Sequence, residues 1–91
     1  MPKKLILHGL VQGVACRYYC SQYGKRLRIR GAVTNLPDGT VKVILNTSSI
    51  SDIERYMHAI RNNPLGVHFY GRIDSIDVYD YTGPLRGDYL F

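Results

Sequence analysis

A glycine-containing turn between an expected strand and an expected helix constrains this chain more than any other stretch. The turn spans His8–Arg17, reads HGLVQGVACR, and follows Leu5–His8, a run that predicts a short strand. After it, apolar residues recur at the three- and four-residue intervals of a helix: Cys16, Tyr19, Cys20, Tyr23 and Leu27. Glycines let a backbone approach a ligand closely, and a helix N-terminus offers unpaired N–H groups. The turn is therefore a candidate phosphate site.

Arg17 strengthens this interpretation, because it stands at the start of the expected helix. Its planar guanidinium presents donors in a fork that matches the oxygens of a phosphate group. The glycine spacing, however, is neither that of a Walker loop nor that of a dinucleotide-binding turn. Taken alone, the stretch fits a tight turn with a solvated arginine equally well.

A second turn, Asn35-Leu36-Pro37-Asp38-Gly39, lies between two strand-like runs, Ile29–Thr34 and Thr40–Leu45. Proline and an Asp-Gly pair favour a tight connection, so the two runs predict an antiparallel hairpin. An asparagine before such a turn usually bonds the local backbone. Asn35 could therefore serve the turn alone, by bonding the local backbone, or belong to a functional site.

The remaining chain predicts a second helix and two further strands. Ser49 and Asp52 are suited to cap a helix, Pro64 follows its end, and its expected apolar stripe is Ile50, Ile53, Tyr56, Met57 and Ile60. Arg72–Tyr81 predicts a strand with a bulge between Ile73 and Ile76, and Asp88–Phe91 a short last strand.

The resulting order is β-α-β-β-α-β with an extra C-terminal strand. It predicts an α+β fold of the ferredoxin-like, split βαβ type: an antiparallel sheet with two helices on one face. In that arrangement we expect the first turn and the strand before Asn35 to be neighbours at one edge of the sheet.

Length and composition indicate a single domain over residues 1–91. Hydrophobic residues make up 45% of the chain and charged residues 21%, which is ordinary for a soluble globular protein. No apolar run approaches the ~20 residues that cross a bilayer, and no secretory signal is visible, so we expect the cytoplasm. The net charge of +5 favours anionic ligands without choosing among them.

Two cysteines, Cys16 and Cys20, lie four positions apart on the first expected helix. Helical geometry points both side chains the same way but does not meet the torsion of a disulfide, so we expect free, partly buried thiols. With His8 they do not form a zinc signature, because the spacing is wrong and no fourth ligand is evident.

Considered together, the two turns resemble the acylphosphatase family. The matching pieces are Gly9–Val14, Arg17 and Asn35–Gly39, at the family's separation, and the similar layout runs from about Lys4 to the C-terminus. The resemblance implies an enzyme that hydrolyses the carboxyl–phosphate bond of small acyl phosphates without metal or other cofactor. Inorganic phosphate would be both product and competing ligand. We expect a monomer that binds neither nucleic acid nor membrane.

The resemblance also implies residue roles. Arg17 would grip the phosphate and Asn35 would orient the attacking water. The phosphate would be surrounded by the backbone donors of a loop formed by Leu10, Val11, Gln12, Gly13, Val14 and Ala15, together with Arg17. Three positions depart from the family's pattern: Cys16 replaces an aromatic residue, Ala32 replaces a bulky aromatic residue, and Thr34 replaces a basic or long side chain.

Two other functions stay open. One is a nucleic-acid-binding module, because ferredoxin-like sheets with exposed aromatics can stack single-stranded bases. Against it, the central strands offer Val33, Val41, Val43 and Leu45 rather than a basic and aromatic signature. The tyrosines of the first helix, Tyr18, Tyr19 and Tyr23, are at core spacing. The other is a phosphate or acyl-phosphate binder that does not catalyse.

Overall fold

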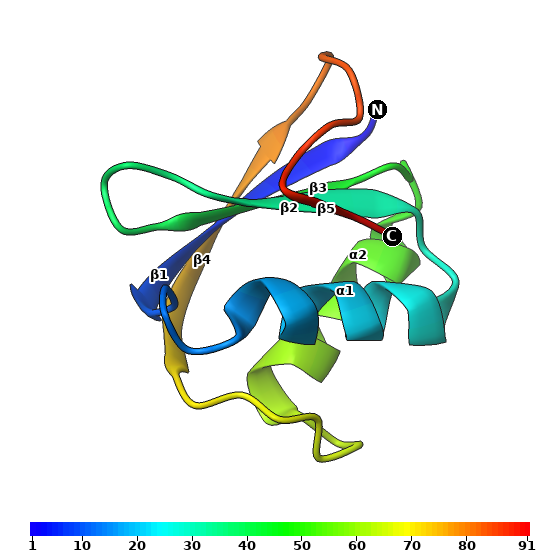
Figure 1. Cartoon of the computed structure of the whole chain (residues 1–91). Coiled ribbons are helices and arrows are strands. Elements are labelled where there is room, and N and C mark those ends of the chain that lie inside the picture. The colour runs from blue at the N-terminus through cyan, green and yellow to red at the C-terminus, as the bar shows by residue number, and fades with distance from the viewer.

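The computed structural model describes residues 1–91 as one antiparallel sheet with two helices on one face (Figure 1). Its elements are β1 (Lys3–Leu10), α1 (Cys16–Leu27), β2 (Gly31–Asn35), β3 (Val41–Leu45), α2 (Ile50–Asn62), β4 (Arg72–Asp80) and β5 (Tyr89–Leu90). The strand order is β4-β1-β3-β2-β5, and every neighbouring pair is antiparallel. The expected ferredoxin-like fold with a short C-terminal strand is confirmed.

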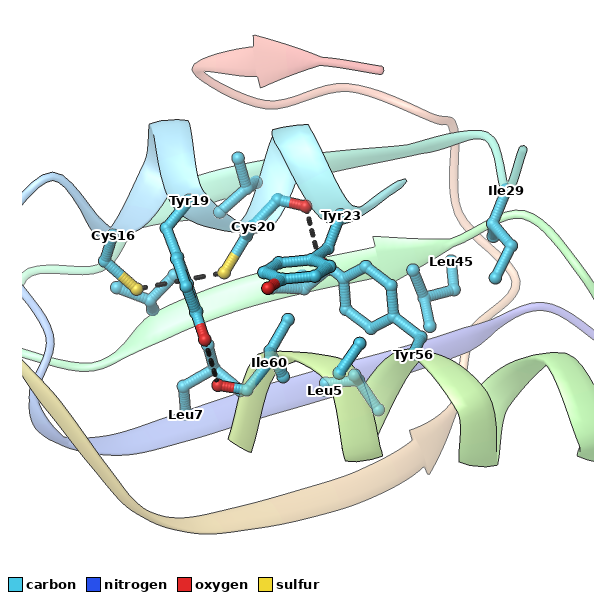
Figure 2. Close-up of a cluster of buried hydrophobic side chains, with 14 of the residues drawn as sticks. Leu5, Leu7, Cys16, Tyr19, Cys20, Tyr23, Ile29, Leu45, Tyr56 and Ile60 are labelled. Atoms are coloured by element: carbon cyan, nitrogen blue, oxygen red, sulfur yellow. Dashed lines mark hydrogen bonds between the residues drawn. The ribbon is translucent and has the colours of Figure 1, made fainter. Parts of the chain in front are cut away.

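The core forms where alternate strand residues meet the inner faces of the helices (Figure 2). Two buried tyrosines tie the helices together, because the Tyr19 hydroxyl donates to the Ile60 carbonyl at 2.6 Å and the Tyr56 hydroxyl to the Cys20 carbonyl at 2.8 Å. Burial raises the pKa of both hydroxyls above the ordinary tyrosine value, so they stay protonated donors. Tyr23 is also buried, so Tyr19 and Tyr23 belong to the core, as expected, but the same expectation is wrong for Tyr18, whose side chain is 49% exposed.

One member of the expected stripe on α2 was assigned wrongly. Ile53, Tyr56 and Ile60 are buried, but Ile50 is 70% exposed. Ile50 is the first residue of α2, directly after Ser49, whose side chain accepts from the Asp52 N–H. The burial of α2 therefore begins at Ile53, and the residue that starts the helix lies outside the core.

The expected bulge in β4 is confirmed. Its register against β1 shifts between His8 and Gly9: Ser75 is opposite His8, Ile73 is opposite Gly9, and Asp74 is the extra residue. Gly9 has φ +132°, and a Cβ there would collide with the Arg72 carbonyl oxygen. The glycine is therefore required by the sheet, where the chain turns towards the first helix.

The expectation that the first turn and the strand before Asn35 are neighbours at one edge of the sheet is wrong. β3 lies between β1 and β2, and β5 occupies the edge beside β2. The turns meet instead through Gln12, whose Nε2 donates to the carbonyl of Leu36 at 2.7 Å and to that of Thr40 at 2.8 Å. One side chain thus ties the loop after β1 to the β2–β3 hairpin across the intervening strand.

Candidate active site

The loop between β1 and α1 has an unusual backbone. Among the hydrogen bonds of the structure, none is donated by a backbone N–H from Val11 to Tyr18; the first in this region is from Tyr19 to the Ala15 carbonyl, at 3.0 Å. Folded proteins pair most backbone donors with other protein groups or with water. A run of free N–H groups at a helix start is an arrangement suited to an anion.

The backbone conformation of the loop explains how this run arises. Gly13 has φ +74° and Ala15 has φ +66°, with Val14 between them on the negative side. Alternating left- and right-handed residues turn successive N–H groups towards a common concavity, which is a known anion-binding geometry. A left-handed alanine is uncommon, and such strain is typical of functional loops.

The start of α1 carries no cap, in contrast to that of α2. Ala15 at the N-cap offers no side-chain hydrogen bond, and the first turn contains no acidic residue. On α2, Ser49 caps the helix and Asp52 lies in the first turn. The partial positive charge of the α1 N-terminus is therefore not neutralised by the protein.

A pocket of about 180 Å³ opens at this place. Four of the seven expected phosphate-binding residues line it: Val11, Gly13, Ala15 and Arg17. Three do not. Leu10 is the last residue of β1 and pairs with Arg72, Gln12 is turned to the hairpin, and the Val14 carbonyl accepts from the Tyr70 N–H at 3.1 Å.

Asn35 lies at the end of β2 and also lines the pocket, together with Arg17 from the first turn of α1. Its side-chain oxygen Oδ1 is buried and has no hydrogen-bond partner. A buried acceptor without a partner is costly to a fold and is rare outside functional positions. The structure therefore brings the two expected catalytic residues to one pocket.

Sequence reasoning missed several residues of this site. Cys16, Tyr18 and Tyr89 line the pocket, and the Tyr89 ring lies 5.1 Å from the Arg17 guanidinium carbon. Asp88 bonds Arg17 directly, with 3.1 Å between Oδ2 and Nη1. No local pattern singles out Asp88 or Tyr89. They reach the site because β5 pairs with β2.

The two cysteines are free and fully buried rather than partly buried, with 3.8 Å between their sulfur atoms. Both side chains belong to the core (Figure 2), and Cys16 also lines the pocket. The hydrogen bond with Cys16, together with burial, raises the pKa of the Cys20 thiol well above its ordinary value. Cys20 therefore stays a neutral, unreactive thiol near pH 7.

Two classes of feature are absent from residues 1–91. No group of three or more His, Cys, Asp or Glu side chains is placed to hold a metal ion. No helix has both the length and the apolar character of a membrane span.

An antiparallel sheet with two helices on one face, and a pocket that gathers free N–H groups, an arginine and an unpaired amide oxygen, defines a ferredoxin-like anion-binding domain. A sequence model of the acylphosphatase family matches residues 3–88. The chain is 30% identical over 83 residues to an acylphosphatase of Mannheimia succiniciproducens, covering 91% of this chain and 87% of that protein. It is 50% identical over 42 residues to one of Petrotoga mobilis, over 46% and 47% of the two chains.

The fold is shared with a solved structure. The crystal structure of acylphosphatase from Bacillus subtilis aligns with a TM-score of 0.74 at 20% identity and covers 94% of each chain. The chain belongs to the acylphosphatase family.

Proposed function

We propose that this acylphosphatase hydrolyses the carboxyl–phosphate bond of small acyl phosphates, with the phosphate held by Leu10–Ala15 and Arg17. The observation that carries the proposal is the run of free N–H groups from Val11 to Tyr18, beside an arginine in the same pocket. These donors would surround the phosphoryl oxygens, and the guanidinium would bind them as a fork. Leu10, Gln12 and Val14 do not line the pocket. Gln12 and Val14 would contribute their free backbone N–H groups, whereas the backbone of Leu10 pairs with Arg72 in the sheet.

The reaction requires little from the protein. A water oxygen bonds to phosphorus, the bond from phosphorus to the carboxylate oxygen breaks, and the electron pair leaves with the carboxylate. A carboxylate departs without protonation, so no general acid is needed. Positioning of the water and stabilisation of phosphoryl charge remain as the sources of catalysis.

Asn35 is proposed to position that water. Its buried Oδ1 can accept a hydrogen bond from the water and so aim a lone pair at phosphorus. A neutral amide is too weak a base to take the proton. The water proton passes to a phosphate oxygen of the substrate, and the products are a carboxylate and inorganic phosphate.

Metal independence follows from the charges that the residues already supply. Arg17 and the helix N-terminus provide positive charge at the phosphoryl group, and the chain offers no ligand cluster for a metal. We further propose a cytoplasmic monomer that acts on small molecules, with inorganic phosphate as a competing ligand.

The open face of the sheet bears on the nucleic-acid alternative. The valines cited against that function belong to the core and face the helices. The opposite face carries Lys4 against the Tyr79 ring, at 5.1 Å, but also Asp77, which pairs with His8. This face carries Lys4, Lys42 and the acidic Asp77, a mixture of charges rather than the uniformly basic stripe that favours a phosphate backbone.

Turnover of benzoyl phosphate tests the proposal. We expect release of benzoate and phosphate at an unchanged rate after exhaustive treatment with a chelator. A protein that binds phosphate without hydrolysing benzoyl phosphate would be a silent binder, and restoration of lost activity by one divalent metal would refute the metal-independent mechanism.

A further inference from the structure

Asp88 connects the two residues to which the proposed function assigns catalysis. One carboxylate oxygen, Oδ2, accepts from Arg17 Nη1 and from the backbone N–H of Asn35, each at 3.1 Å. The end of β2 and the start of α1 are therefore joined through a single atom. Asp88 comes directly before β5, so a third segment of the chain completes the site.

Asp88 is itself held in place. Its N–H donates to Thr34 Oγ1 at 3.2 Å. The preceding residue, Gly87, passes so close to β2 that a Cβ would collide with that hydroxyl and would lie 3.2 Å from the Ala32 side chain. Ala32 and Thr34 are two of the positions that depart from the family's pattern. Their small size makes room for the segment that delivers Asp88.

The contacts of Arg17 leave part of its guanidinium free. Arg17 Nη1 donates a hydrogen bond to Asp88, and the Arg17 guanidinium carbon lies 5.1 Å from the centre of the Tyr89 ring. No other protein group accepts a hydrogen bond from the Arg17 side chain. The remaining donors belong to a residue that lines the pocket. A guanidinium fixed at one nitrogen keeps the other two available to a phosphate.

We propose that Asp88 is a positioning residue: its carboxylate fixes the Arg17 guanidinium against the end of β2, in the orientation that binds the phosphoryl group. The proposal rests on the proposed function of the pocket. A carboxylate on an arginine could instead be an internal competitor of phosphate. Asp88 does not line the pocket, and the N–H groups from Val11 to Tyr18 remain without a partner, which favours positioning over competition.

The ion pair is partly exposed, with 37% of the Arg17 and 39% of the Asp88 side chain accessible. A pair this accessible contributes little to folding stability. Its effect is to restrict the rotamers of a long, flexible side chain before substrate arrives. Misplacement of a group that binds the reacting centre commonly lowers the rate by roughly a hundredfold.

The test compares Asp88→Ala and Asp88→Asn with a control, Asp80→Asn. Asp80 also pairs with a cation, Lys3, but on β4 and outside the pocket. Benzoyl phosphate kinetics, competitive inhibition by inorganic phosphate and ¹⁵N relaxation of the Arg17 guanidinium are measured on each variant, with circular dichroism as a check of folding.

We expect Asp88→Ala to mobilise the guanidinium, weaken phosphate inhibition and lower kcat/KM by about 10- to 100-fold. Asp88→Asn should lose less, because an amide oxygen still accepts from both N–H groups, and Asp80→Asn should match the wild type. Tighter phosphate inhibition with faster turnover in Asp88→Ala would show that Asp88 competes with phosphate for Arg17, and would overturn the proposal. Wild-type kinetics in folded Asp88→Ala would also overturn the proposal. Because guanidinium relaxation needs no substrate, it tests Asp88 even if the wild type fails to hydrolyse benzoyl phosphate.

Discussion

Arg17 and Asn35 share a pocket but offer different chemistry to it. Arg17 presents charged donors, which in the proposed function bind the phosphoryl group both in the ground state and in the transition state. Asn35 presents one unpaired acceptor, Oδ1, which suits a water. Substitutions at the two positions should therefore affect binding and turnover differently.

We expect Arg17→Ala to weaken phosphate inhibition and slow turnover together. Asn35→Ala should lower kcat by roughly a hundredfold or more, about 3 kcal/mol, while phosphate inhibition stays near that of the wild type. The measurement is steady-state kinetics with phosphate as inhibitor. Arg61→Ala and Asn46→Ala, exposed and outside the pocket, are the matched controls. A folded Asn35→Ala enzyme that keeps most of its activity would exclude the role of Asn35.

For single residues, the sequence predicts a functional role only where the residue belongs to a recognisable local motif. Arg17 follows a glycine turn, and Asn35 precedes a Pro-Asp-Gly turn, so each is part of a visible motif. Asp88 has no such motif. Its proposed role depends on a contact across the fold with Arg17, and nothing in the neighbours of Asp88 along the chain indicates that contact.

Among the elements, the loop after β1 depends on a support that its own sequence does not reveal. Gln12 is expected to bind phosphate through its backbone N–H, and its side chain in addition bonds the carbonyls of Leu36 and Thr40. Strands, helices and the β4 bulge could be predicted from periodicity and turn residues. The link between loop and hairpin could not, because it depends on the order of strands in the sheet.

Gln12→Ala should separate this support from the loop backbone. Loss of the side chain removes two hydrogen bonds, although the carbonyls of Leu36 and Thr40 each keep a backbone N–H donor. At about 0.5–1.5 kcal/mol per hydrogen bond, we expect a loss of about 1–3 kcal/mol of unfolding free energy and weaker phosphate inhibition. Thermal denaturation and inhibition assays measure both effects. Gln22→Ala on α1, a half-buried glutamine without such bonds, is the control. A Gln12→Ala protein as stable as this control would show that the loop holds its shape alone.

For the whole molecule, ligand binding and folding are linked. Phosphate that binds only the folded state adds RT ln(1 + [L]/Kd) to stability, about 2.7 kcal/mol at a concentration one hundred times Kd. For a domain of this size we expect the melting temperature to rise by roughly 10–20 °C. The rise should be absent in Arg17→Ala. An equal shift with sodium chloride at matched ionic strength would indicate general screening instead.

The contact between Arg17 and Asp88 also has a consequence for how the protein folds. It joins residues separated by 71 positions along the chain, and a chain segment that long must close before the two can meet. Folds rich in such distant pairings form slowly, and local helices and hairpins precede them. The Arg17–Asp88 contact is made where β5 pairs with β2, so β2 must be in place before β5 can add to it. Recovery of hydrolytic activity after dilution from denaturant should then lag behind the return of the helical circular dichroism signal. The activity would therefore measure the formation of the Arg17–Asp88 contact late in folding.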